Sequence, residues 1–321
     1  MPQTGSDGTP TPWPVPLTGV VPPVCTPLTP AGDVDTRSLR SLVEHLLAAG
    51  VDALFVLGSS GETAYLSDAQ RRTVVQTAVD AAGGRVPVLA GVIDTTTARV
   101  TDHARAALAL GADALVATAP FYAATHPAET ADHFRRVRAA VDLPLIGYDI
   151  PSAVHSKLTA ATLLALAEDG TLAGLKDSSG DLGALRRLLV ALRARGLDRT
   201  FTVFTGSELT VDAALLAGAH GVVPGLGNVD PAGYVRLCAH ARAGRWAEAA
   251  AEQDRLTVLS ALTETGDPAH MSAGASALGG YKAALGLLGV IDHPATAAPQ
   301  RPLPDASVRD VRRLLVEAGL L

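Results

Sequence analysis

The chain has 321 residues, of which 48% are hydrophobic and 18% charged, and its formal net charge is −6. This composition predicts a globular protein with a large core, and the negative charge argues against nucleic-acid binding, which needs a basic patch. Cys25 and Cys238 lie too far apart in the sequence to suggest a disulfide framework or a zinc site, and no run reaches about 18 apolar residues, so no membrane span is expected.

The chain begins with a segment rich in proline and polar residues. Residues 1–14, MPQTGSDGTPTPWP, lack the basic and apolar regions of a secretory signal. Segments of this composition cannot bury enough apolar surface to fold. We therefore predict a disordered tail over residues 1–14 and a cytoplasmic protein whose folded part begins at residue 15.

After this tail, short apolar segments alternate with longer amphipathic ones, which is typical of parallel β/α units. Eight strands are predicted, at residues 18–25, 51–57, 86–92, 112–118, 143–148, 171–176, 201–205 and 221–224. The helices predicted between them are residues 37–49, 69–82, 96–110, 129–141, 158–168, 182–195 and 209–217. Eight repeats favour a (β/α)8 TIM barrel over an open doubly wound sheet, although spacing alone does not prove closure.

No further strand is predicted after the eighth. The remaining helices are predicted at residues 231–243, 247–262, 278–288 and 307–320, with a loop over residues 264–277. We therefore predict three parts: the tail, a barrel with the catalytic site over residues 15–230, and the last barrel helix with a C-terminal helical extension over residues 231–321.

The sixth predicted strand ends in an unusual lysine. Lys157, Lys176 and Lys282 are the only lysines among 26 basic residues, so this chain uses arginine where plain positive charge suffices. A lysine at the end of a buried strand suggests chemistry that arginine cannot perform, because an amine can lose its proton and attack a carbonyl, whereas a guanidinium stays charged. The alternative is that the stem of Lys176 crosses the strand end and its ammonium reaches water.

Polar and aromatic residues follow other strands at what would be the same face of the barrel. In GSSGE, at residues 58–62, the backbone amides and two hydroxyls could hold a carboxylate, although such a sequence also suits an ordinary turn. Tyr148 could move a proton to or from a substrate, or be a rim aromatic. For Tyr122, a packing or interface role is favoured over a role in the site.

Other chemistries find little support in the sequence. No lysine follows a glycine, as a P-loop requires, and the glycines at residues 225–227 do not complete a dinucleotide-binding motif. The nine histidines show no HxH or HExxH spacing, and there is no GxSxG motif. We therefore expect neither a metal nor a cofactor.

Several motifs resemble those of the dihydrodipicolinate synthase/N-acetylneuraminate lyase family. They are GVVPPVCTPL (19–28), GSSGE (58–62), PFY (120–122), YDIPS (148–152), GLKDSSGD (174–181) and GAHGVVPG (218–225). The resemblance covers residues 18–321. It implies a (β/α)8 barrel with a helical extension, a homo-oligomer (dimer or tetramer), and a metal-free class I lyase that acts on pyruvate or another 2-oxo acid.

The resemblance also implies roles for single residues. Lys176 matches the Schiff-base lysine and Tyr148 the phenol that moves protons. Ser59 and Ser60 match positions that hold the carboxylate of the 2-oxo acid. Ser60 would link Tyr148 to Tyr122, which in the family reaches into the site of a neighbouring subunit. Val223 matches a position whose backbone carbonyl contacts the substrate.

Two departures from the family pattern bear on the substrate. Ala153 stands where dihydrodipicolinate synthases carry an arginine, and only His155 and Lys157 are basic nearby. Loss of that carboxylate clamp speaks against aspartate semialdehyde as the acceptor. The second departure is Asp149, which replaces the usual Asn and would add an acidic group beside the site.

Ser207 and Glu208, which follow the seventh strand, could contact substrate hydroxyls, or could simply begin the next helix. Our prediction is a lyase or aldolase that joins or separates pyruvate and an uncharged, for example hydroxylated, aldehyde. The alternatives are a dehydratase of a 2-keto-3-deoxy sugar acid that uses the same imine, a 4-hydroxy-tetrahydrodipicolinate synthase, a barrel that binds a keto acid without turnover, and a phosphate-binding barrel.

Overall fold

The computed structural model describes residues 16–321, so the predicted tail over residues 1–14 lies outside the described residues. Eight parallel strands form one sheet in the order β1-β8-β7-β6-β5-β4-β3-β2. They are β1 (Gly19–Val20), β2 (Leu54–Val56), β3 (Val88–Gly91), β4 (Ala114–Thr118), β5 (Leu145–Asp149), β6 (Gly174–Asp177), β7 (Thr202–Thr205) and β8 (Gly221–Val222). All eight predicted strands are present.

The two outermost strands of this order meet and close the barrel. The backbone amide of Asp52 donates to Val20 O at 2.9 Å, and that of Phe55 donates to Pro22 O at 3.0 Å. β1 is much shorter than predicted because Pro22 and its neighbour Pro23 have no N–H to donate to a ladder. The predicted barrel is confirmed and the open sheet is excluded.

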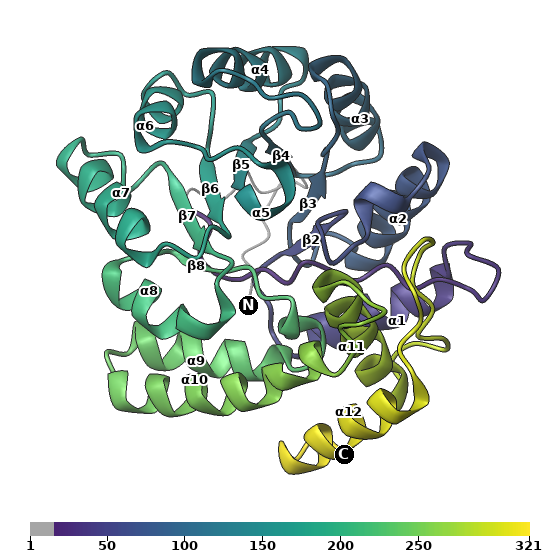
Figure 1. Cartoon of the computed structure of the whole chain (residues 1–321). Coiled ribbons are helices and arrows are strands. Elements are labelled where there is room, and N and C mark those ends of the chain that lie inside the picture. The colour runs from purple at the N-terminus through teal and green to yellow at the C-terminus, as the bar shows by residue number, and fades with distance from the viewer. Residues whose placement is uncertain (1–15) are drawn as a thin grey trace.

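Helices surround the strands in Figure 1, as the alternating sequence pattern predicted. The helices that follow successive strands are α1 (Thr36–Ala48), α2 (Asp68–Ala82), α3 (Thr97–Ala109), α4 (Pro127–Ala140), α5 (Pro151–Val154), α6 (Ala160–Glu168), α7 (Leu182–Ala194), α8 (Val211–Ala217) and α9 (Pro231–Arg242). None of the helices within residues 16–321 combines the length and apolarity needed to cross a bilayer.

The C-terminal part contains α10 (Trp246–Ser260), α11 (Ala273–Leu287) and α12 (Asp305–Glu317), and α12 packs against α11 (Figure 1). The loop predicted over residues 264–277 is too long, because α11 already begins at Ala273. Ser272 caps this helix, since its side chain accepts a hydrogen bond from the amide of Ala275 at 3.1 Å. The start of this helix was not predicted, because its first residues are mostly Gly, Ala and Ser, a composition that suggested a loop.

Apolar side chains form two cores. One lies between the strands and the surrounding helices, and the other fills the inside of the barrel. The inner core includes Phe55, Tyr148, Phe204 and Val223. Because side chains alternate across a strand, residues two apart on one strand share a face, and the inner core therefore identifies the residues that point into the barrel.

A buried ion pair joins the C-terminal part to the loop after β2. The Lys282 ammonium on α11 donates to Glu62 Oε2, and both side chains are fully buried. Lys282 Nζ also donates to Ala295 O at 2.7 Å, and Glu62 Oε1 accepts from the amide of Ala297 at 2.7 Å. Each charge thus has more than one partner, as a buried ion pair requires.

We predict that Lys282→Met lowers the free energy of unfolding by about 3–5 kcal/mol, because it leaves the Glu62 carboxylate buried without a counter-charge. Urea unfolding measures the change. Arg313→Ala is the control, since it removes an exposed pair with Glu317 and should cost less than about 1 kcal/mol. The double variant Glu62→Gln/Lys282→Met should recover part of the loss. Equal stability of Lys282→Met and the control would contradict this account.

Candidate active site

A row of side chains crosses the inside of the barrel near the carboxyl ends of four strands. In register, Thr118 on β4 pairs with Tyr148 on β5, Tyr148 pairs with Lys176 on β6, and Lys176 pairs with Phe204 on β7. Residues in register on adjacent parallel strands project to the same side of the sheet. Since Tyr148 and Phe204 belong to the inner core, the whole row faces the barrel interior.

Lys176 is buried against aromatic rings. It is 5% exposed, and its Nζ lies 3.9 Å from the ring centroid of Tyr148 and 5.0 Å from that of Phe55. Aromatic faces attract a cation without forming a hydrogen-bonded ion pair. The burial of Lys176 speaks against the alternative in which its ammonium reaches water.

The three lysines of the chain differ in their partners. Lys157 is paired with Asp149, and Lys282 with Glu62. Among residues 16–321, no carboxylate forms a salt bridge with Lys176. An amine that is not committed to an ion pair is free to react with a carbonyl carbon.

Gly206, after β7, leaves space for the side chains of Ser178 and Lys176. A Cβ at Gly206 would lie 2.1 Å from Ser178 Oγ and 3.3 Å from Lys176 Cε, so a side chain there would displace the Ser178 hydroxyl and crowd Lys176. Phe55, Ser178 and Gly206 thus shape the surroundings of Lys176. The sequence analysis did not assign them to the site, because their roles depend on contacts between strands that are distant in the sequence.

The Tyr148 hydroxyl is within 3.3 Å of Ser59 Oγ. Burial alone would raise the pKa of Tyr148, but the positive charge of Lys176 and hydrogen bonding from Ser59 outweigh it, so this pKa lies below its ordinary value. We expected Ser60 to contact the Tyr148 hydroxyl, whereas in the structure Ser59 makes this hydrogen bond. Ser60 instead lines the cavity described next.

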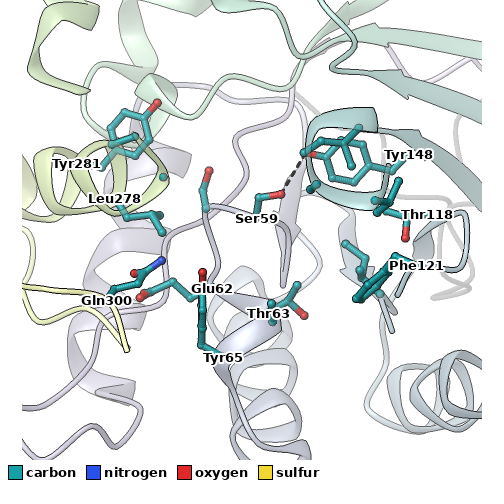
Figure 2. Close-up of a pocket in the computed structure, with 18 residues that line it drawn as sticks. Ser59, Glu62, Thr63, Tyr65, Thr118, Phe121, Tyr148, Leu278, Tyr281 and Gln300 are labelled. Carbon is teal, nitrogen blue, oxygen red and sulfur yellow. Dashed lines mark hydrogen bonds between the residues drawn. The ribbon is translucent and has the colours of Figure 1, made fainter. Parts of the chain in front are cut away.

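A cavity of about 410 Å³ opens beside Tyr148. Figure 2 shows Tyr148, Thr118 and Phe121 on one side and Tyr281, Leu278 and Gln300 on the other. The complete wall consists of Ser59, Ser60, Glu62, Thr63, Ala64, Tyr65, Ile93, Thr118, Phe121, Tyr148, Ile150, Ala153, Val154, Gly274, Ala277, Leu278, Tyr281 and Gln300. Lys176 is not part of this wall, but its Nζ lies 3.9 Å from the ring centroid of Tyr148, which is. The barrel and the C-terminal part together form the cavity.

The charged residues near YDIPS do not face this cavity. Ala153 is part of the wall, whereas His155 and Lys157 lie at a separate pocket, outside the wall. Asp149 is fully buried on the opposite side of β5, where it accepts from the amide of Leu158 at 3.0 Å and pairs with Lys157. Burial raises its pKa despite the nearby ammonium. The expectation of an acidic group beside the site is therefore wrong.

Glu208 is held by hydrogen bonds within the protein. Its buried carboxylate accepts hydrogen bonds from the amide of Leu226 at 2.7 Å, from Tyr234 Oη at 3.1 Å and from Tyr281 Oη at 3.3 Å. Burial raises its pKa. Ser207 lies at a separate small pocket. Neither residue lines the main cavity, and the substrate contacts expected for both stay a prediction.

The remaining expected residues lie at different places. Val223 is in the inner core with Tyr148. Tyr122 is 98% exposed, with a left-handed φ of 78°, and is outside the cavity wall. Within the described residues, no group of three His, Cys, Asp or Glu side chains could hold a metal ion.

Known proteins resemble the chain over nearly its whole length. An uncharacterized DapA-like lyase of Halobacterium salinarum is 36% identical over 308 residues, which are 96% of each chain. A 4-hydroxy-tetrahydrodipicolinate synthase of Azoarcus sp. is 34% identical over 243 residues, which are 76% of this chain and 82% of the relative.

Among solved structures, a prophage protein of the dihydrodipicolinic acid synthase family from E. coli K12, in complex with pyruvate, superposes with a TM-score of 0.87 at 29% identity. The match covers 95% of this chain and all of that one. The profile of the dihydrodipicolinate synthetase family matches residues 16–318. The chain therefore belongs to the dihydrodipicolinate synthetase family, and the resemblance and lyase class inferred from its motifs are confirmed.

Proposed function

We propose that the chain is a class I aldolase or lyase in which Lys176 forms a Schiff base with pyruvate or a derivative of it. The observation that carries the proposal is the amine of Lys176, which is buried, has no carboxylate partner among residues 16–321 and lies against the Tyr148 ring. The pyruvate complex of the related E. coli protein supports pyruvate as the 2-oxo acid.

The reaction in the direction of synthesis begins at the 2-oxo carbon. The neutral amine of Lys176 attacks this carbon. Tyr148, as a phenol, then donates its proton to the hydroxyl of the adduct, which leaves as water and gives a protonated imine. Tyr148, as a phenolate, then removes a proton from C3, and the imine accepts the electron pair to give an enamine. The enamine attacks the aldehyde carbon, so that the C3–C4 bond forms. The aldehyde oxygen takes the proton back from Tyr148, and water releases the product by hydrolysing the imine.

Two serines are suited to hold the 2-oxo acid. Ser59 contacts the Tyr148 hydroxyl, and Ser60 lines the cavity beside it. In our proposal their amides and hydroxyls bind the carboxylate, and Ser59 stabilises the Tyr148 phenolate. The backbone carbonyl of Val223 would face the pyruvoyl group from the inner core.

We further propose a cytoplasmic homo-oligomer, with a tetramer as the assembly. Cys25 and Cys238 are free and buried, which is compatible with a reducing compartment. Tyr122 is a large aromatic side chain that is almost fully exposed in one chain. In the proposed assembly it is covered by, and reaches toward, the site of a neighbouring subunit.

The aldehyde partner is uncharged in our proposal. Ala153 provides a methyl group at the wall, and no lysine, arginine or histidine belongs to the residues that line the cavity. A carboxylated acceptor would therefore lack a cationic partner. Product analysis distinguishes an aldolase from a dehydratase, since cleavage releases pyruvate and an aldehyde whereas dehydration leaves the carbon chain intact.

We predict that Lys176→Arg lowers kcat/KM for the aldol reaction by about 10³-fold or more, because a guanidinium cannot form the imine. Lys157→Arg is the matched control, since it keeps a cation beside Asp149 and lies outside the cavity wall. Steady-state assays on both variants, with pyruvate binding measured by calorimetry, make the test. Full activity of Lys176→Arg would refute the imine. Absence of turnover in the parent chain, with pyruvate bound equally by both variants, would identify a binding protein.

The pH profile tests the role of Tyr148. Because its pKa lies below the ordinary value, exchange of the C3 protons of pyruvate into D2O should rise with pH to a plateau, with a midpoint below the ordinary pKa of tyrosine. Ser59→Ala removes a hydrogen bond that favours the phenolate, so the midpoint should move upward. Tyr148→Phe should abolish this limb of the profile. An unchanged midpoint in Ser59→Ala would exclude Ser59 from this role.

A further inference from the structure

The cavity wall contains a buried hydroxyl with no partner directly beside Tyr148. Thr118 is 3% exposed, and within the described residues its Oγ1 makes no hydrogen bond. Buried hydroxyls in folded proteins are normally satisfied by protein or water. Since Thr118 lines the cavity, a molecule bound there can supply the missing partner.

One other wall atom, Gln300 Oε1, is also buried without a partner. Figure 2 shows Gln300 at the opposite side of the cavity, near Glu62, whereas Thr118 lies next to Tyr148. Of the two, Thr118 is therefore the residue that can contact atoms close to the bond that forms or breaks.

The strand register gives Thr118 a defined place in the reaction. Thr118, Tyr148 and Lys176 occupy consecutive positions of one row across β4, β5 and β6. Adjacent strands are about 4.8 Å apart, so Thr118 lies roughly 10 Å from Lys176 along the row, with Tyr148 between them. A substrate attached to Lys176 and extending past Tyr148 would bring its aldehyde-derived half to Thr118.

The wall of the cavity that Thr118 lines is largely apolar. Its large side chains include those of Ile93, Phe121, Ile150, Val154 and Leu278. The single carboxylate among the wall residues, that of Glu62, is already bound by Lys282 and the amide of Ala297. An apolar wall favours an apolar ligand, and a few polar groups fix its orientation.

We propose that Thr118 binds the aldehyde half of the substrate. Its hydroxyl donates a hydrogen bond to the aldehyde oxygen, which becomes the C4 hydroxyl of the product, while the apolar wall holds an aliphatic or aromatic substituent. The acceptor is thus an uncharged aldehyde with an apolar body. This inference rests on the proposed imine at Lys176, and Thr118 has no part in forming that imine.

The test uses Thr118→Val, which replaces the hydroxyl by a methyl group of similar shape, and Thr118→Ser, which keeps the hydroxyl. Isobutyraldehyde, benzaldehyde, glyceraldehyde and succinic semialdehyde are supplied with pyruvate, and kcat/KM is measured for each. The parent chain should prefer isobutyraldehyde or benzaldehyde. Thr118→Val should lose about tenfold or more in kcat/KM for the aldehyde, and Thr118→Ser should retain most of it.

Borohydride trapping of pyruvate on each variant separates this inference from the proposed function. If Thr118 acts on the aldehyde, trapping at Lys176 is equal in the parent chain and in both variants. Equal trapping with unchanged aldehyde kinetics in Thr118→Val would overturn the role of Thr118, and a preference for glyceraldehyde or succinic semialdehyde would overturn the apolar acceptor. Equal loss of trapping in both variants would show a merely structural role. Absence of trapping in the parent chain would instead contradict the imine itself.

Discussion

The site depends on the parallel register that sets Tyr148 beside Lys176 inside the barrel. This register places the amine against an aromatic ring instead of a carboxylate, in a chain whose other two lysines are both ion-paired. The same register lets Lys176 act on Tyr148, because the positive charge of Lys176 favours the phenolate of Tyr148 over the phenol. A phenolate next to a buried amine can accept the proton that the amine must lose and return protons to a substrate. In the proposed mechanism, one backbone pairing thus brings together the nucleophile and the base.

The C-terminal part and the barrel together form the cavity. Helix α11 contributes Leu278 and Tyr281 to the cavity, and the buried pair between Lys282 and Glu62 fixes this helix to the GSSGE loop. Glu62 has a left-handed backbone conformation, with φ of 59°, which is uncommon for a residue with a side chain. Its hydrogen bonds to Lys282 and Ala297 hold the loop in that conformation. Stability and the shape of the cavity therefore depend on the same contacts.

The sequence was sufficient for the architecture, and it predicted that Lys176 and Tyr148 would lie at adjacent strand ends, as they do. Eight apolar segments predicted the strands, and the rarity of lysine drew attention to Lys176. The contacts of other residues depend on side-chain direction, which the sequence does not give. Ser59 and Ser60 are adjacent in a turn, and only the folded loop shows which of them meets Tyr148. Glu208 looked like a free acid after a strand, but its phenolic partners are 26 and 73 residues away. Thr118 ends an apolar strand and gave no signal, because an unpartnered hydroxyl can be recognised only from its surroundings.

The most direct test of the account is reduction of the intact protein with borohydride in the presence of pyruvate, followed by mass spectrometry of its peptides. The account predicts a reduced pyruvoyl adduct on Lys176, and none on Lys157 or Lys282, whose amines are held by carboxylates. If pyruvate and larger 2-oxo acids bind the protein but leave Lys176 unmodified, the imine mechanism is contradicted. In that case the buried amine would serve to bind a keto acid without turnover.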